Sequence, residues 1–296
     1  MVTLRTAIIS DQLSMDFEEA LIKMKNRFEY VEIHALWNKT VEELHDGEAR
    51  EVESLLQKHN MNVSCLSTTL FLMCPLHNSV QSLKKFNDTF LVFTGDYGEH
   101  MDCLKRCIEL SKRFDTEYIR IFPFRLEKGF DGDFHAVYAE MRERFGNAVA
   151  LAEKEKKCLI LENCPYSYLP RGNMTFELAQ SLNSRSFMLL YDIGNSFRAA
   201  HQPCPERFKE MSLIDEYEVI KERVAYFHFK DYRKRGAEFQ HVIFGEGDVG
   251  YEKLCSRIRM DNGGKIVSLE PEVEPCDIER SIQNFIDCSI HDDNNN

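Results

Sequence analysis

The sequence predicts a single-domain (β/α)8 TIM barrel. Short runs of β-branched and aromatic residues alternate eight times with segments whose apolar residues have helical spacing. Strict strand–helix alternation implies parallel strands joined by right-handed crossovers, and eight such units close into a barrel. The length of 296 residues is typical of one barrel. A doubly wound open sheet is the alternative, but no glycine-rich phosphate turn follows the first strand.

Each expected strand is a short apolar run that ends at polar or turn-forming residues. In chain order the runs are TLRTAIIS at 3–10, YVEIHAL at 30–36, NVSCLST at 62–68, YIRIFPF at 118–124, CLILEN at 158–163, FMLLYDI at 187–193, VAYFHFKD at 224–231 and KIVSLEP at 265–271.

Each expected helix carries apolar residues three or four positions apart, so that one face can pack against the barrel. These helices are expected at 16–28, 40–59, 99–115, 133–157, 175–183, 207–223, 250–260 and 277–288.

Two parts of the chain fall outside this alternation. Segment 70–98 holds Pro75, two glycines and a second apolar run, and a connection of this length is uncommon without a function or a structure of its own. We expect either a lid or interface element, or an ordinary insertion with a short helix. The barrel is expected to span 1–290, and the polar tail 291–296 to be disordered.

Composition and charge argue against several classes of partner. The formal net charge is −12, whereas nucleic-acid binding needs clustered Lys and Arg. No apolar run approaches the roughly 20 residues of a membrane helix, and no signal peptide is recognisable. We expect a cytoplasmic protein without nucleic-acid or membrane partners, and leave open whether it is a homo-oligomer. The ten Cys form no CxxC pair and are expected to be reduced and mostly buried.

Four consecutive expected strands end in side chains that can bind a metal: Glu162, Asp192, His228 and Glu270. Parallel barrel strands all end at the same face, where barrel enzymes keep their chemistry. Because side chains two apart share a face of a strand, these four are expected to meet above a small apolar layer. The alternative is four independent strand-end residues that cap helices or pair with lysines.

A divalent metal would explain three carboxylates so close together, since without a cation they would repel one another. Three oxygen donors and one imidazole suit Mn²⁺, which we favour, Mg²⁺ or Co²⁺, and tolerate Zn²⁺. Four protein ligands leave positions for two adjacent substrate oxygens, so that the metal can polarise a carbonyl and stabilise an enediolate.

Several motifs resemble those of the xylose-isomerase-like barrel superfamily, which includes sugar and sugar-phosphate isomerases and epimerases, inosose dehydratases and apurinic endonucleases. The motifs are LEN at 161–163, YDIGN at 191–195, HFKD at 228–231, GEGDV at 245–249 and SLEP at 268–271, with VEIH at 31–34 in the N-terminal half. The resemblance implies one metal ion held by the four strand-end residues. It also implies that Glu162 and Glu270 act as acid and base on opposite faces of a bound sugar.

One residue differs from the pattern of the superfamily and argues against one group of its members. Asn195 stands where many sugar epimerases of this group carry a histidine. The endonuclease relatives need that histidine among the ligands of three zinc ions, so a role in DNA repair is not expected.

The leading prediction is a metal-dependent isomerase or epimerase of a sugar, sugar phosphate or polyol, which works by proton transfer through a metal-stabilised enediolate. A keto-polyol dehydratase of the inosose type would begin with the same proton abstraction. A non-catalytic sugar-binding or regulatory barrel is the alternative from another class.

Five residues are candidates for binding the substrate. His34 ends the second strand, and Trp37, the only Trp, is near enough to form a pocket wall. Asn195 and Arg198 follow Asp192, and Arg198 could meet an anionic group or cap a loop. Lys230 shares the face of His228 and could bind a substrate oxygen.

Two open questions concern the seventh strand and its loop. Lys230 could instead pair with one of three nearby acids: Asp231, Glu246 and Asp248. The glycine-rich loop 245–250 could hold phosphate, as loops there often do in barrels, but the two acids within it favour a tight turn.

Overall fold

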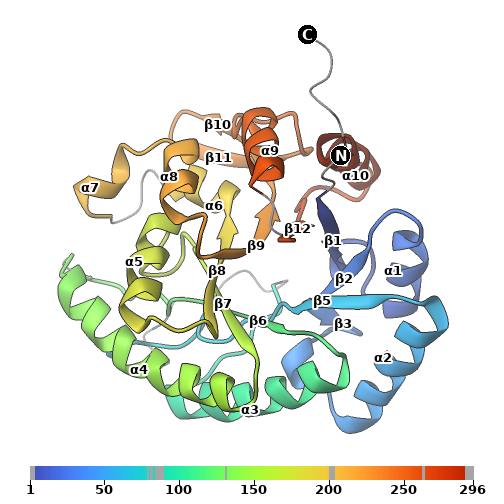
Figure 1. The fold of residues 1–296 in the computed structure, drawn as a ribbon, viewed down its shortest axis with the longest axis horizontal. Coiled ribbons are helices and arrows are strands. Elements are labelled where there is room, and N and C mark those ends of the chain that lie inside the picture. Colours follow the sequence, from blue (N-terminus) through green and yellow to red (C-terminus); the bar gives the residue numbers. More distant parts are fainter. Residues whose placement is uncertain are drawn as a thin grey trace.

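The computed structural model describes residues 4–290 except 79, 81, 82, 84–89, 131, 200–203, 262 and 263. Eight parallel strands form one closed barrel in the order β1-β12-β9-β8-β7-β6-β5-β2 (Figure 1), which confirms the predicted fold class. The strands are β1 (Arg5–Ile9), β2 (Tyr30–Ile33), β5 (Asn62–Leu66), β6 (Tyr118–Ile121), β7 (Cys158–Glu162), β8 (Phe187–Asp192), β9 (Val224–Phe229) and β12 (Ile266–Leu269). Each expected strand is found, with ends up to three residues shorter than the apolar run.

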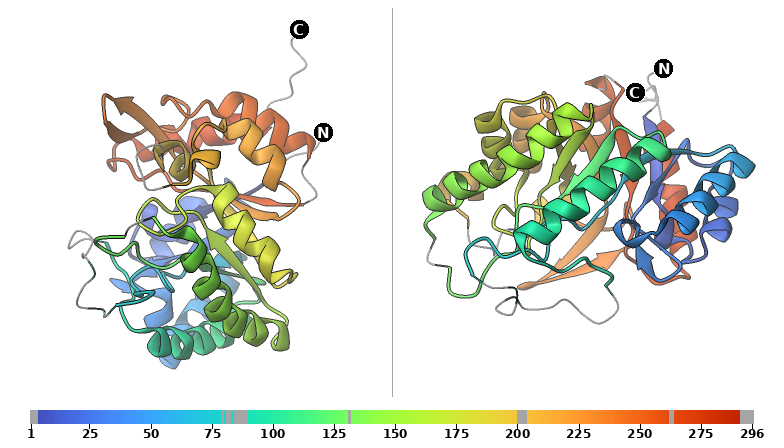
Figure 2. Two further views of the ribbon diagram at one scale, coloured as in Figure 1. Left: turned by 90° about the vertical axis from the view of Figure 1, so that its left-hand side faces the viewer. Right: turned by 90° about the horizontal axis from the view of Figure 1, so that it is seen from below.

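Helices surround the barrel on its outside (Figures 1 and 2). The longer ones are α1 (Phe17–Met24), α2 (Asp46–His59), α3 (Tyr97–Arg113), α4 (Phe134–Lys154), α5 (Gly172–Leu182), α8 (Leu213–Ile220), α9 (Tyr251–Met260) and α10 (Ile278–Ile290). Among the described residues, no helix is long and apolar enough to cross a membrane. The cytoplasmic location expected from the sequence stays a prediction.

Two expected helices are interrupted, because a side chain caps a new helix within each. The segment 40–59 contains a 3-10 turn, η2 (Val41–Glu43), before His45 accepts the Glu48 N–H and starts α2. The segment 207–223 is divided into α7 (Glu206–Lys209) and α8, which Ser212 caps by accepting the Asp215 N–H.

Several short elements were not predicted, and all of them follow barrel strands. They are η1 (Ser10–Gln12), the hairpin β3 (Ala35–Leu36) and β4 (Lys39–Thr40), α6 (Ile193–Arg198), and the hairpin β10 (Asp231–Arg235) and β11 (Glu238–Val242). Figure 2 shows the β10–β11 hairpin extending outward beyond the barrel strands. These elements line or support the end of the barrel where the strands finish.

The inside of the barrel is filled by a compact apolar layer, as predicted. Its buried members are Ala7, Cys65, Cys158, Ile160, Leu190, Ala225, Tyr226 and Ile266. Cys158 and Ile160 lie on the same face of β7 as Glu162, and Tyr226 precedes His228 by two residues on β9. The polar residues at the strand ends therefore lie directly above this buried apolar layer.

The described part of segment 70–98 is tied to the barrel. Met73 and Thr94 form a parallel bridge, and Thr69 Oγ1 accepts the Phe93 N–H at 2.8 Å. Leu72 packs with Phe122 and Cys164, and Phe90 packs against this cluster. A lid role for the segment stays a prediction, and the tail 291–296 lies outside the described residues.

A disulfide joins Cys255 of α9 to Cys288 of α10, so the expectation of ten reduced thiols is wrong for this pair. The other eight Cys are free, and six of them are buried, as expected. The sequence does not reveal the pair, because its partners are 33 residues apart and only the packing of the two last helices brings them together.

We predict that reducing this disulfide lowers the free energy of unfolding by about 3 to 4 kcal/mol, the loop-closure entropy of a segment of 33 residues. Chemical denaturation of the oxidised protein and of a C255A/C288A variant measures the difference. Replacing the exposed free thiol in a C276A variant is the control and should leave the midpoint unchanged. Equal midpoints for the oxidised protein and C255A/C288A would contradict the assignment.

Candidate active site

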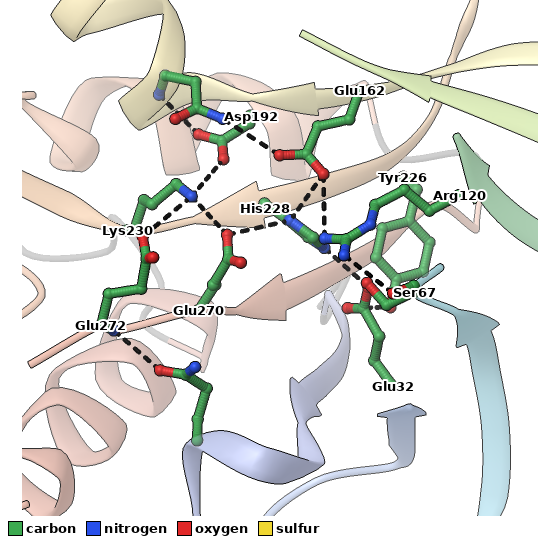
Figure 3. Close-up of polar contacts among 12 residues, drawn as sticks. Glu32, Ser67, Arg120, Glu162, Asp192, Tyr226, His228, Lys230, Glu270 and Glu272 are labelled. Carbon is green, nitrogen blue, oxygen red and sulfur yellow. Dashed lines mark hydrogen bonds and ion pairs between the residues drawn. The ribbon is translucent and has the colours of Figure 1, made fainter. Parts of the chain in front are cut away.

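The four strand-end residues expected to bind a metal lie together at one end of the barrel (Figure 3). Glu162 and Asp192 end β7 and β8, His228 lies in β9, and Glu270 directly follows β12. The barrel register aligns Asp192 with His228 and His228 with Ser268, so that the side chains fall in one layer. One donor atom from each of the four residues lies within 4.8 Å of the others.

This donor set fits a divalent cation. Burial raises the pKa of Glu162 to about 7 against the attraction of Arg120 and His228, and Glu270 and Asp192 raise it further. His228 Nδ1 is buried without a hydrogen-bond partner among the described residues. It lies 3.3 Å from Glu270 Oε2 and 3.7 Å from Glu162 Oε2. A cation among these atoms would relieve the carboxylate repulsion and use the free nitrogen.

Lys230 points into the same group of carboxylates. Its Nζ lies 2.6 Å from Glu270 Oε2, 2.9 Å from Asp192 Oδ2 and 3.2 Å from Glu272 Oε2 (Figure 3). The contact with Asp192 is an ion pair without a well-directed hydrogen bond. Burial opposes the charge, but these carboxylates outweigh it and hold the pKa of Lys230 well above its ordinary value.

The alternative pairing of Lys230 with Asp231, Glu246 or Asp248 is wrong. Asp231 instead accepts four backbone N–H groups, those of Tyr232, Gly245, Gly247 and Val249, at 2.9 to 3.4 Å. The N–H groups of the glycine-rich loop thus donate to a carboxylate of the protein itself. This arrangement agrees with the tight turn expected there and leaves the loop amides engaged within the protein.

Glu32 in β2 is a site residue whose role the sequence analysis missed. His228 Nε2 donates to Glu32 Oε1 at 2.9 Å, and the Tyr226 hydroxyl donates to Glu32 Oε2 at 3.0 Å. Burial disfavours the charge of Glu32, but His228 outweighs it and lowers the pKa to about 2. A carboxylate on the far nitrogen fixes the ring so that Nδ1 faces the other three candidate ligands. The available signal was a glutamate inside a buried strand, in the motif VEIH.

Arg120 in β6 is the second residue that was missed. Its Nη1 donates to Glu162 Oε2 at 3.1 Å, while Nε and Nη2 donate to the Thr68 and Ser67 carbonyls at 3.1 and 2.9 Å. The guanidinium is buried and its donors are directed at fixed acceptors, so it holds one oxygen of Glu162 in place. The signal was an arginine in the middle of the apolar run YIRIF.

Asn195 and Arg198, both expected to bind substrate, lie in α6 and line the cavity above the ligands. Asn195 donates from its backbone N to Asp192 at 2.7 Å and from Nδ2 to Glu162 Oε1 at 3.1 Å, so it orients two of the candidate ligands. Arg198 donates to the Tyr232 hydroxyl at 3.0 Å and lies 5.0 Å from the Tyr166 ring.

A cavity of about 470 Å³ opens beside the four candidate ligands. Its walls include Glu162, Glu270, Lys230, His34 and, from segment 70–98, Leu72, Phe90 and Leu91. Four of the five residues expected to bind substrate therefore line it: His34, Asn195, Arg198 and Lys230.

Trp37 is placed elsewhere and is not among the lining residues. It forms the turn of the β3–β4 hairpin, where both Trp37 and Asn38 have positive φ angles. Its ring packs edge-on against Phe17 at 6.4 Å. The expected pocket wall is therefore not supplied by Trp37, because the hairpin turns the chain away from the strand direction.

Comparisons with known proteins agree with this geometry. A family model described as xylose isomerase-like TIM barrel matches residues 25–288. A search of curated protein sequences finds no match.

Three solved structures share the fold at low sequence identity. A D-tagatose 3-epimerase-like protein aligns with 96% of this chain and 97% of its own at 13% identity and a TM-score of 0.72. IolI with a bound zinc atom aligns with 97% of this chain and 98% of its own at 13% identity and a TM-score of 0.70. The probable 3-DHS dehydratase AsbF of Bacillus anthracis aligns with 98% of this chain and 100% of its own at 13% identity and a TM-score of 0.68.

We predict that Glu32→Gln weakens metal binding about 10- to 100-fold, because His228 loses the carboxylate that fixes its orientation. Competition with a chelator measures the affinity for Mn²⁺ and Zn²⁺. The control is Glu29→Gln, an exposed neighbour that should keep the wild-type value. An unchanged affinity in Glu32→Gln would show that His228 does not depend on this contact.

We also predict that Gly247→Ala destabilises the protein by about 1 to 3 kcal/mol through overpacking. An added Cβ would lie 2.1 Å from Asp231 Oδ1 and 2.6 Å from the Tyr232 carbonyl oxygen. Gly146→Ala in α4, where nothing lies within 4 Å of the added Cβ, is the matched control and should be neutral or stabilising. Equal denaturation midpoints for the two variants would refute the close packing.

Proposed function

Because the chain belongs to the xylose isomerase-like TIM barrel family, we propose that it is a metal-dependent isomerase or epimerase of a sugar, sugar phosphate or polyol. Members of this fold include the epimerase-like and dehydratase structures described above. The proposed ligands are Glu162, Asp192, His228 and Glu270, whose donor atoms lie within 4.8 Å of one another. Mn²⁺ is the first candidate, and Zn²⁺, Co²⁺ and Mg²⁺ also suit these donors.

The observation that carries the proposal is the convergence of two glutamates, one aspartate and one histidine at a cavity that Glu162 and Glu270 both line. Burial raises the pKa of Glu162 to about 7. Burial also acts on Glu270, but Lys230 and His228 outweigh it and hold its pKa well below the ordinary value. The pKa values of the two glutamates are thus moved in opposite directions, which agrees with different roles for them in proton transfer.

The protein residues then have separate tasks. On opposite faces of the bound sugar, one of Glu162 and Glu270 takes the proton from the carbon next to the carbonyl and the other returns a proton. Arg120 and Asn195 hold the two oxygens of Glu162 in place. A bound divalent cation would supply polarisation of the carbonyl and stabilise the negative charge that develops on its oxygen.

Lys230 and Arg198 are proposed to bind the substrate. Both line the cavity, and the Lys230 ammonium is within reach of oxygens placed beside Glu270. The cavity of about 470 Å³ falls within the range of small-molecule sites, as a monosaccharide requires.

A keto-polyol dehydratase is the second candidate, favoured by the similarity to a probable dehydratase. It shares the first proton abstraction and then expels a hydroxide from the neighbouring carbon. The mass of the product separates the two, since a dehydratase product has lost one water and an isomer has not.

We predict that Glu162→Gln and Glu270→Gln each slow hydrogen–deuterium exchange at the carbon next to the carbonyl by about 100- to 10,000-fold, the usual contribution of a general acid or base. The measurement is NMR of D-fructose, D-allulose and D-tagatose incubated in D₂O with metal-loaded protein.

The control is Glu51→Gln on the exposed side of α2, which should exchange at the wild-type rate. Bound metal is quantified in every variant, so that loss of the ion is told apart from loss of the acid or base. Wild-type exchange in both Glu162→Gln and Glu270→Gln, with metal present, would reject the assignment.

A further inference from the structure

A second histidine faces the cavity from the strands across the barrel. His34 directly follows β2, is only 7% exposed and lines the cavity. Asp11, in η1 after β1, also lines it. In the closed strand order β1 stands four strands from β7 and β2 four strands from β8, so both residues lie opposite Glu162 and Asp192.

Asp11 fixes the orientation of the His34 ring. Asp11 Oδ2 lies 3.2 Å from His34 Nδ1, while Oδ1 accepts the Ala35 N–H at 3.2 Å. The ring stacks on Phe90 at 5.7 Å with an angle of 21° between the planes. With Nδ1 directed at the carboxylate, Nε2 is the nitrogen left for another partner.

Nε2 of His34 has no hydrogen-bond partner among the described residues although it is buried. Burial disfavours a charged ring, but Asp11 outweighs it and raises the pKa of His34, Glu42 adds to the rise, and Arg120 opposes it. A buried ring nitrogen without a hydrogen-bond partner is unfavourable, and a hydroxyl can pair with Nε2 as either donor or acceptor.

His100 shows what a histidine looks like when it only fills the core. Its Nδ1 accepts the Phe71 N–H at 3.0 Å, and its ring packs against Phe71 and Phe93. Burial lowers its pKa to about 4, and it does not line the cavity. His34 differs in its carboxylate partner and in its place on the cavity wall, and both differences favour contact with a ligand.

We propose that Asp11 and His34 form a substrate-binding dyad, in which His34 Nε2 makes a hydrogen bond with a substrate hydroxyl beyond the two oxygens at the reacting end. Asp11 is the positioning residue of the dyad. The inference rests on the proposed function and sharpens it, since it requires a polyhydroxy ketone long enough to reach from the Glu162 side of the cavity to the β1–β2 side.

The test uses two variants of His34 and two substrates. Asn can keep a donor toward Asp11 but lacks the outer nitrogen, whereas Gln can place an amide near the position of Nε2. The substrates are the hexulose among D-fructose, D-allulose and D-tagatose that exchanges fastest, and hydroxyacetone, which carries only two adjacent oxygens.

We predict that His34→Asn lowers kcat/KM for exchange of the hexulose about 10- to 100-fold, the effect of leaving one buried hydrogen bond unmade. The exchange of hydroxyacetone should change less than about threefold, and His34→Gln should recover part of the hexulose activity. An equal loss on both substrates, or no loss on either, would overturn the dyad.

A direct measurement separates this inference from the proposed function. In protein labelled with ¹⁵N-histidine, the Nε2 signal of His34, assigned by its absence in His34→Asn, should shift with saturating hexulose and not with hydroxyacetone. Asp11→Asn should lower the pH at which that signal titrates. If no ketose exchanges with wild type, the proposed function fails; if the hexulose exchanges and the Nε2 signal stays unmoved, the dyad alone fails.

Discussion

Repulsion among buried carboxylates is the constraint on which the rest of this structure depends. Glu32, Glu162 and Asp192 are nearly inaccessible to solvent, and Glu270 lies beside them. Burying a charge is unfavourable unless it is paired and hydrogen-bonded. The barrel therefore brings a cation or a donor to each acid: Arg120 from β6, His228 and Lys230 from β9 and its end, and Asn195 from α6.

The same pairings give the site its geometry. Glu32 fixes the ring of His228 from below, and Arg120 fixes Glu162 from the side, so the donor atoms that face the cavity have few orientations left. Because Lys230 favours the charge of Glu270 while burial disfavours that of Glu162, the pKa values of these two glutamates are shifted in opposite directions. The contacts that compensate the buried charges are thus the same contacts that orient the candidate metal ligands.

The barrel and its four strand-end residues could be predicted, because both follow from local patterns that closure of the barrel then aligns. Glu32 and Arg120 were missed because a charged residue within a strand looks the same in sequence whether it faces inward or outward. Trp37 was misplaced because the β3–β4 turn depends on backbone angles that a lone Trp does not signal. The Cys255–Cys288 bond depends on packing between distant helices, which local sequence does not encode.

The hydrogen bonds of Asp231 affect the entropy of ligand binding near the glycine-rich loop. Its carboxylate accepts hydrogen bonds from N–H groups of the glycine-rich loop. In other barrels, loops at this place often bind the phosphate of a ligand with such groups. The conformational entropy of that loop is consequently lost when the chain folds and not when a ligand arrives. The Asp231 carboxylate therefore orders the loop 245–250 before any ligand binds. Binding of a ligand beside this loop need not pay the entropy of ordering its backbone.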